Sequence, residues 1–399
     1  MDASDWEGRF DRFVRPFLEA WRLKKRRHWA PLYLRALLMP GERKSIEPLA
    51  ARVAPGHEQE LRHFVNESAW DDDAVEGVLW EKADSLLGGN DAVAIVDDTS
   101  LPKKGTHSVG VAHQYCGALG KQANCQCLVS VTLAKDDVPL PVVLRLYLPE
   151  EWAQDAARRQ GVGVPESVEF LPKWKIALNE LKRLRRAGVR FGSVLADAGF
   201  GVCAEFRNAL SAAGWLWAVG ILSNHRAYPA HVKVRMPRPH PHGGRQRKHG
   251  VPSHAVRSVE EMIEELGPEA FRTVTWRTGT KGPLRGVFAV RRVRLGDGGK
   301  ARAGTVLPGR EVWLVCEQRE NERKYYVTNH GERASTRTIV SAIKARWSCE
   351  QAHQQLKEEL GLDHFEGRSW RGLRHHSLLT MIAFAFLQQE RLRENKPAA

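Results

Sequence analysis

The chain contains 399 residues, with 61 Lys and Arg against 47 Asp and Glu, so its formal net charge is +14 at pH 7. Its hydrophobic content of 42%, with 13 Trp and 13 Phe, is typical of a folded globular protein and excludes a disordered polypeptide. The longest apolar runs reach only about ten residues, too few to span a bilayer, and the excess of positive charge favours an anionic partner such as nucleic acid.

Residues 1–88 carry apolar side chains at helical spacing and show almost no alternation of β-branched residues. This pattern predicts a helical N-terminal domain, with helices over residues 10–27, 31–38, 45–53, 58–64 and 72–87. The basic segment RLKKRRH, residues 22–28, suits contact with DNA, although a solvent-exposed helix face without sequence preference can have the same composition.

Residues 89–222 have the pattern of an α/β core. Residues 92–96 form a short apolar strand that ends at Asp97 and Asp98, and a Gly- and Lys-rich loop follows. Further strands are predicted over residues 127–134, 142–148, 193–196 and 215–221, with a turn over residues 136–141 and helices over residues 173–187 and 202–213. Strands in hairpin order followed by helical crossovers are typical of an RNase H-like mixed sheet flanked by helices, so we predict an α/β fold of this class.

Residues 223–335 combine a basic loop with a β-rich insertion. No Asp or Glu occurs between Ile221 and Val259, where eight Lys or Arg, six His and five Pro favour a DNA-contacting loop. This loop has no Cys partners for its histidines, which argues against a zinc site at His240, His242, His249 and His254. Strands are predicted over residues 271–278, 286–293, 312–317 and 325–328. Residues 336–399 then supply C-terminal helices over residues 338–360 and 373–393, which complete the α/β core.

Asp97 and Asp197 occupy matching positions, each directly after a predicted apolar strand. Carboxylates held at strand ends can bind hard cations such as Mg²⁺, and two metal ions about 3.5–4 Å apart are a common device for phosphoryl chemistry. Asp is also a frequent turn former, which is the simpler explanation for either residue alone. Asp98 is an alternative to Asp97 as the first metal ligand.

The segment ARWSCEQAHQQLKEELG places Arg346, Glu350 and Lys357 on one face of the predicted helix over residues 338–360. Cys349 belongs to a separate apolar face that suits packing on a sheet. An Arg–Glu pair four residues apart is by itself an ordinary surface ion pair. The full spacing R-x3-E-x6-K is therefore the feature that indicates a function.

Together, these segments resemble bacterial insertion-sequence DDE transposases, of the branch called DDE superfamily endonucleases. RWSCEQAHQQLK is similar to their Y-R-E-K signature, AIVDDTSLPKKGTHSVGVAHQYCGALGKQANCQ to the region of their first aspartate, and VLADAGFG to that of their second. The signature tyrosine has no counterpart here, because the corresponding position is Ile343.

The resemblance implies a transposase that cuts DNA strands at the ends of its element and joins them to a target by attack of the freed 3′-OH. It implies that Asp97, Asp197 and Glu350 are the catalytic residues and bind two Mg²⁺ ions, for which Mn²⁺ can substitute. Arg346 and Lys357 would then hold DNA phosphates near the cut.

Lys103 and Lys104 flank the first aspartate and can bind the phosphates of the DNA backbone through their point charges. A solvent-exposed loop without a DNA contact would have the same composition. The expected partners are double-stranded DNA, as terminal inverted repeats and target, and a second copy of the chain on that DNA. A membrane is not an expected partner.

We expect a bacterial cytoplasmic, nucleoid-associated protein with reduced thiols, because the N-terminus lacks a secretion signal and the six cysteines form no CxxC pair. Two other functions remain open from the sequence. One is a domesticated DNA-binding or regulatory protein, and the other is a structure-specific nuclease on the same fold.

Overall fold

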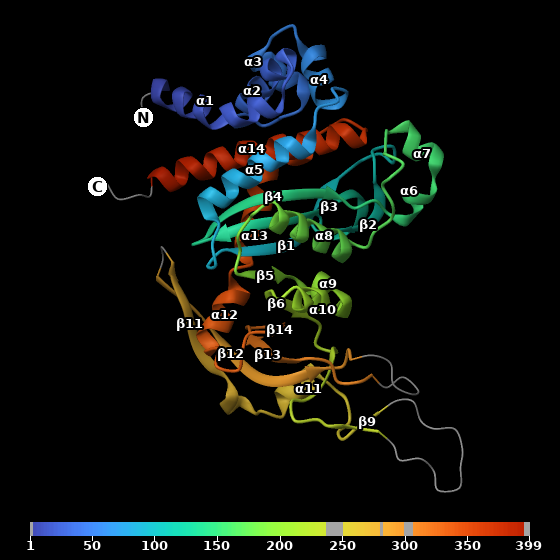
Figure 1. The fold of residues 1–399 in the computed structure, drawn as a ribbon, viewed down its shortest axis with the longest axis vertical. Helices are drawn as coiled ribbons and strands as arrows, with labels where there is room; N and C mark the ends of the chain where they lie inside the picture. Colours follow the sequence, from blue (N-terminus) through green and yellow to red (C-terminus); the bar gives the residue numbers. More distant parts are fainter. Residues whose placement is uncertain (1–2, 237–249, 280–281, 299–305, 395–399) are drawn as a thin grey trace. The chain divides into compact units, whose positions relative to one another are not determined.

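A computed structural model describes residues 3–236, 250–279, 282–298 and 306–394, and the chain divides into two compact units (Figure 1). The first unit consists of Met1–Gly192 and Trp347–Ala399, and the second consists of Ser193–Arg346. The C-terminal helices therefore share a unit with the N-terminal half of the chain. The histidines at 240, 242 and 249 lie outside the described residues.

The N-terminal part of the first unit is helical, as predicted, with α1 (Ala3–Ala20), α2 (Lys24–Leu38), α3 (Ile46–Val53), α4 (Glu58–Asn66) and α5 (Asp72–Leu87). The single helix predicted over residues 10–27 is wrong, because the chain breaks between α1 and α2. Arg22 has a left-handed φ of 44° at this break. The neighbouring Trp21 is fully buried and packs against Phe64 and Trp70.

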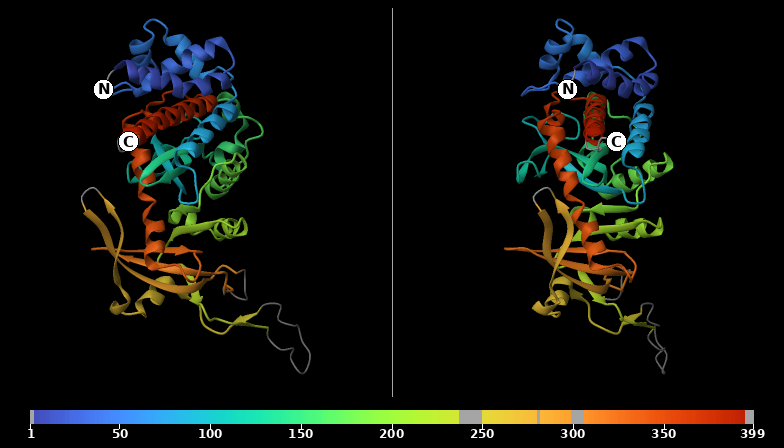
Figure 2. Two further views of the ribbon diagram at one scale, coloured as in Figure 1. Left: turned by 60° about the vertical axis from the view of Figure 1, so that its left-hand side comes forward. Right: turned by 90° about the vertical axis from the view of Figure 1, so that its left-hand side faces the viewer.

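The long helix α14 (Trp370–Glu394) forms much of the hydrophobic core of the first unit. Most of its side chains from Leu373 to Phe386 are buried, and it packs against α2, α4, α5 and the strand β4 (Val138–Leu146). Figures 1 and 2 show α14 beside α5, between the other N-terminal helices and the sheet. Among the described residues, no helix is both long and apolar enough to cross a membrane.

The sheet of the first unit is built around β3 (Lys121–Lys135), which pairs antiparallel with β1 (Val93–Pro102), β2 (Ala112–Cys116) and β4. The hairpin between β3 and β4 turns at Asp136 and Asp137, whose φ angles of 49° and 65° suit a two-residue type I′ turn. The turn predicted over residues 136–141 is therefore too long. β4 already includes Pro139 and Pro141, which a strand tolerates at the edge of a sheet.

The helices α6 (Glu150–Gln154), α7 (Ala156–Gly161) and α8 (Lys173–Arg186) follow β4, and α8 packs on β3. Arg145 of β4 contacts two buried carboxylates. Its Nη2 lies 2.5 Å from Glu76 of α5 and 3.0 Å from Glu180 of α8. These charge-assisted hydrogen bonds join both helices to the strand.

The second unit contains a mixed sheet. β5 (Ser193–Ala196) pairs in parallel with β6 (Leu216–Ile221), and antiparallel pairing continues from β6 through β14 (Arg323–Thr328), β13 (Glu311–Gln318) and β12 (Gly282–Leu295). β12 also pairs with β11 (Arg272–Gly279) and β7 (Arg226–Pro229). The strands predicted as an insertion thus extend the sheet of β5 and β6, because β14 pairs directly with β6. Helices flank both sheets, and the parallel pair β5–β6 makes the sheet of the second unit a mixed one, which confirms the predicted α/β class.

The remaining elements of the second unit connect these strands. They are α9 (Ala198–Gly201), α10 (Ala204–Ala212), β8 (Val234–Arg235), β9 (Val251–Pro252), β10 (Arg257–Ser258), α11 (Val259–Glu264) and the 3₁₀ turn η1 (Pro268–Ala270).

The helix predicted over residues 338–360 is two helices, α12 (Thr336–Lys344) and α13 (Trp347–Glu358), separated by a turn at residues 345–346. The buried stripe of α12 lies within residues 339–343, whereas that of α13 includes Cys349 and Leu356. In one straight helix these stripes would face nearly opposite directions, since each residue advances by about 100°. Neither Pro nor Gly marks the break, so the sequence pattern does not reveal it.

Candidate active site

Asp97 and Asp98 lie in the middle of the ten-residue strand β1, so the prediction that they follow the end of a shorter strand is wrong. The strand continues to Pro102 because Thr99 and Ser100, which look like loop residues in the sequence, are buried and pair with β3. The backbone on both sides of the aspartates is therefore held by a neighbouring strand.

The two aspartates point to opposite faces of the sheet, as successive strand residues do. Asp98 faces α8, where Lys173 Nζ lies 2.7 Å from its carboxylate. Asp97 faces α13, where its carboxylate lies close to Cys349 and His353. Asp97 therefore shares a face with the helix that carries Glu350, and Asp98 does not.

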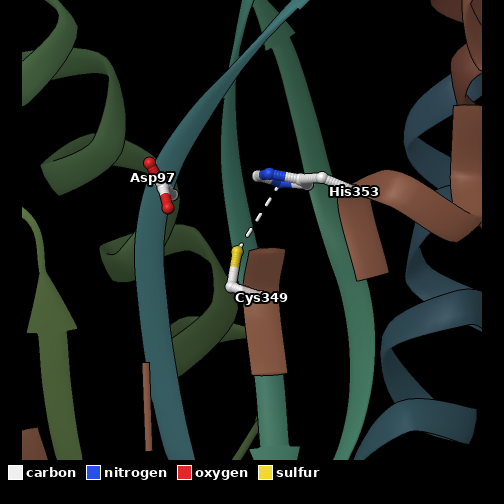
Figure 3. Close-up of side chains that lie close together, drawn as sticks. All are labelled: Asp97, Cys349 and His353. Atoms are coloured by element: carbon white, nitrogen blue, oxygen red, sulfur yellow. Dashed lines mark hydrogen bonds between the residues drawn. The ribbon is translucent and has the colours of Figure 1, made fainter. Parts of the chain in front are cut away.

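Asp97 and α13 bring together a cluster of atoms that could ligate a metal (Figure 3). A carboxylate oxygen of Asp97, Sγ of Cys349 and a ring nitrogen of His353 all lie within 4.8 Å of one another. His353 Nε2 is 3.6 Å from Cys349 Sγ and 2.9 Å from Ser130 Oγ, and Thr132 Oγ1 is 3.3 Å from the same sulfur. Cys349 and His353 are buried, whereas Asp97 is half-buried.

This cluster is not among the site residues predicted from the sequence. Cys349 was predicted only to pack on the sheet, and His353 was not identified. The signal that could have found them is their spacing of four residues, which places both side chains on the same side of a helix.

Glu350 follows Cys349 on α13 and is exposed. Lys357 lies two helical turns later on the same side of this helix. Arg346 belongs to the turn before α13, so the prediction that one helical face carries all three residues is wrong for Arg346.

Asp197 follows β5 directly, as predicted, and caps the short helix α9. Its Oδ1 accepts a hydrogen bond from the Phe200 amide at 3.2 Å. α9 packs closely on β6 because Gly201 has no side chain: a Cβ there would lie 1.9 Å from the Gly220 carbonyl oxygen. The backbone around Asp197 is therefore tightly packed. Asp197 belongs to the second unit, whereas Asp97 belongs to the first.

A groove in the first unit contains Lys103 and Lys104. Its lining comes from residues 42–43, the segment that follows β1, and the segment around the 3₁₀ turn η2 (Leu362–His364). Lys103 Nζ donates a hydrogen bond to the Phe365 carbonyl oxygen at 2.7 Å, and burial lowers the pKa of this lysine. Lys104 is exposed. The two lysines therefore differ, because the backbone already engages Lys103.

A family model described as DDE superfamily endonuclease matches residues 16–283. The chain belongs to this family. The resemblance recognised in the sequence is thus confirmed, and the family generally uses divalent metal ions. The residues matched include Asp97 and Asp197 and end before Glu350.

A further similarity is to a probable transposase for insertion sequence element IS701 from Microchaete diplosiphon. The two sequences are 29% identical over 185 residues, which cover 46% of this chain and 46% of that protein. The match thus spans about half the length of this relative.

The carboxylates of this DDE family chain are of the donor type that suits a divalent cation. Asp97 and Glu350 offer oxygen ligands, which Mg²⁺ and Mn²⁺ prefer. Asp97 is presented from the middle of a paired strand and is half-buried, so its backbone is held in place at a residue that is partly exposed.

Proposed function

We propose that the protein is the transposase of a bacterial insertion sequence, which cuts DNA at the ends of the element and joins the freed 3′-OH to a target. The observation that carries this proposal is the placement of Asp97 on β1, facing the helix that bears Glu350. Membership in the DDE superfamily endonuclease family and the partial similarity to a probable transposase support it.

In this proposal, Asp97, Asp197 and Glu350 together hold two Mg²⁺ ions, for which Mn²⁺ can substitute. When bound, such ions would supply activation of the attacking oxygen and stabilisation of the leaving oxygen in attack on a phosphodiester. The pairing of β1 with β3 makes the position of Asp97 rigid, because the residues before and after Asp97 are both paired with β3. Water or a DNA 3′-OH can then be positioned by the same carboxylates, so cutting and joining need no covalent protein–DNA intermediate.

Asp97 is the better candidate for the first metal ligand than Asp98. The Asp98 carboxylate is engaged by the Lys173 ammonium on the face covered by α8. An aspartate that binds the same metal ion as Glu350 must lie on the face of the sheet that α13 covers. Asp97 lies on that face.

Basic side chains of the first unit are proposed to bind the DNA backbone. Lys104 is exposed in the groove, and Lys357 lies on the same side of α13 as Glu350. Arg346, in the turn before α13, has the same proposed role, whereas Lys103 contributes mainly by anchoring the segment that contains Phe365. The N-terminal helices of residues 1–88 are proposed to recognise the terminal inverted repeats, with two copies of the chain assembled on the DNA.

The test is to incubate the purified protein with DNA that carries the flanking ends of its own gene, with Mg²⁺ or Mn²⁺, and to map the cut positions. Asp97→Asn, Asp197→Asn and Glu350→Gln should each abolish cutting while leaving DNA binding intact. Glu358→Gln is a matched control, because Glu358 is an exposed glutamate of the same helix.

The alternative functions give different results. Cutting by all three variants would contradict the proposed catalytic residues. Cutting without joining of the 3′-OH end would indicate a nuclease, and binding of the ends without any metal-dependent cutting would indicate a regulatory protein.

A further inference from the structure

The side chains of Cys349 and His353 meet Asp97 at the interface between β1 and α13, and the proposed strand cleavage uses only Asp97 of the three (Figure 3). Two of the potential ligands come from one helix and the third from a paired strand of the same unit. Such a set combines a thiol, an imidazole and a carboxylate. This combination suits Zn²⁺ and similar transition metals, whereas Mg²⁺ prefers oxygen ligands alone.

The spacing of the sulfur and nitrogen atoms matches a tetrahedral metal. Zn–S bonds of about 2.3 Å and Zn–N bonds of about 2.0–2.1 Å, at a tetrahedral angle, place the two ligand atoms about 3.6 Å apart. Cys349 Sγ and His353 Nε2 are 3.6 Å apart. The Asp97 carboxylate lies within 4.8 Å of both, so it can supply the third ligand with only a small movement.

The neighbours of the cluster can support both ligands. Ser130 Oγ lies 2.9 Å from His353 Nε2 and 3.2 Å from the Asp97 carbonyl oxygen. A metal ion on this nitrogen would displace the Ser130 hydroxyl, which can then donate its hydrogen bond to the Asp97 carbonyl oxygen alone. Thr132 Oγ1, 3.3 Å from Cys349 Sγ, can donate a hydrogen bond to the thiolate that a metal requires.

The burial of the cluster is uneven. Cys349 is fully buried and His353 is 6% exposed, whereas Asp97 is half-buried. A metal ion would therefore enter beside the aspartate and reach two ligands that are shielded from water. Burial of Cys349 and His353 strengthens metal–thiolate binding, and the partial exposure at Asp97 leaves a fourth coordination position for water.

We propose that Asp97, Cys349 and His353 form a binding site for a zinc-class divalent ion. A zinc-class ion held there takes the Asp97 carboxylate away from the cations that strand cleavage requires, so it inhibits cleavage. The binding site rests on the geometry of the cluster alone, whereas the inhibition rests on the proposed function.

The binding site is tested by Co²⁺ titration of the full-length protein, after removal of metal with a chelator and under reducing conditions. Wild-type protein should bind one Co²⁺ with the visible bands of a tetrahedral ion and a thiolate-to-cobalt charge-transfer band. The charge-transfer band requires a sulfur ligand, so it separates this site from any site built of histidine alone.

Two variants and one control make the assignment specific. Cys349→Ser should lose the charge-transfer band, and His353→Gln should weaken Co²⁺ binding by more than the roughly 10–100-fold that loss of a second-shell partner costs. Cys316→Ser, which alters a buried cysteine of the second unit, should leave the band unchanged. The absence of the band from the wild-type protein would overturn the site. So would its persistence in Cys349→Ser, or wild-type Co²⁺ affinity in a His353→Gln variant with a native circular dichroism spectrum.

The inhibition is tested separately by adding Zn²⁺ to Mg²⁺-dependent cleavage. Micromolar Zn²⁺ should inhibit the wild-type protein and inhibit Cys349→Ser at least about tenfold less well. Equal inhibition of both proteins would refute the coupling to Asp97. If no condition gives cleavage, the proposed function fails, and the Co²⁺ titration still decides the metal site.

Discussion

Replacing each of the two adjacent aspartates with asparagine tests whether strand alternation identifies the catalytic residue. Asp97→Asn and Asp98→Asn each remove one negative charge and keep nearly the same shape, at neighbouring positions of β1. The Asp98 carboxylate lies 2.7 Å from Lys173 Nζ, with side-chain exposures of 32% and 34%. An ion pair this exposed contributes at most about 1 kcal/mol, so Asp98→Asn should fold normally.

The two substitutions should differ strongly in strand cleavage. Asp97→Asn replaces an ionised metal ligand by a neutral amide, and cleavage should fall by at least about 10³-fold, which corresponds to about 4 kcal/mol of activation free energy. Asp98→Asn should change the cleavage rate by no more than about fivefold, the equivalent of about 1 kcal/mol.

The assay is single-turnover cleavage of labelled DNA that carries the ends of the element, at saturating protein. Electrophoretic mobility shift of the same DNA measures binding, and chemical unfolding measures stability. A cleavage defect in Asp98→Asn as large as that in Asp97→Asn, with native stability, would refute the argument from strand alternation. So would an active Asp97→Asn.

Three further predictions concern stability and DNA binding. Burial lowers the pKa of His376 to about 4; its unfolded pKa is about 6.5, so the unfolded state binds the proton first. The unfolding free energy should therefore fall by roughly 2 kcal/mol as the pH drops from 8 to 5, and urea denaturation of His376→Asn should lack this part of the pH dependence. Glu76→Gln weakens a buried ion pair with Arg145 and should lower the free energy of unfolding, measured by urea denaturation, by about 3 kcal/mol. A decrease below about 1 kcal/mol would contradict a stabilising role of this ion pair. Lys104→Ala should lower the slope of log Kd against log salt by about one, and Lys103→Ala should instead lower the melting temperature; equal salt slopes for both variants would contradict the distinction.

Local pattern was sufficient for much of the fold and for the family. The helical character of residues 1–88, the basic helix α8 and the strands β11 to β14 were predictable, although the break between α1 and α2 was not, because apolar periodicity and turn residues are properties of short segments. The segments around Asp97, Asp197 and Glu350 were recognisable for the same reason, since each motif is continuous in the chain.

Element ends were less predictable. β1 was predicted to stop before Asp97, although Thr99 and Ser100 continue it, because their burial depends on pairing with β3. The break between α12 and α13 carries no Pro or Gly. It arises because the two helices bury their apolar stripes in different units.

The sequence by itself thus determined the class of chemistry, because the residue types and spacing of each motif can be recognised without knowing its tertiary contacts. Tertiary structure alone decided that Asp97 rather than Asp98 faces α13, and that Cys349 and His353 meet it there. These relations join residues far apart in the chain. They depend on how a strand is paired and which face a helix covers, and no local pattern encodes either.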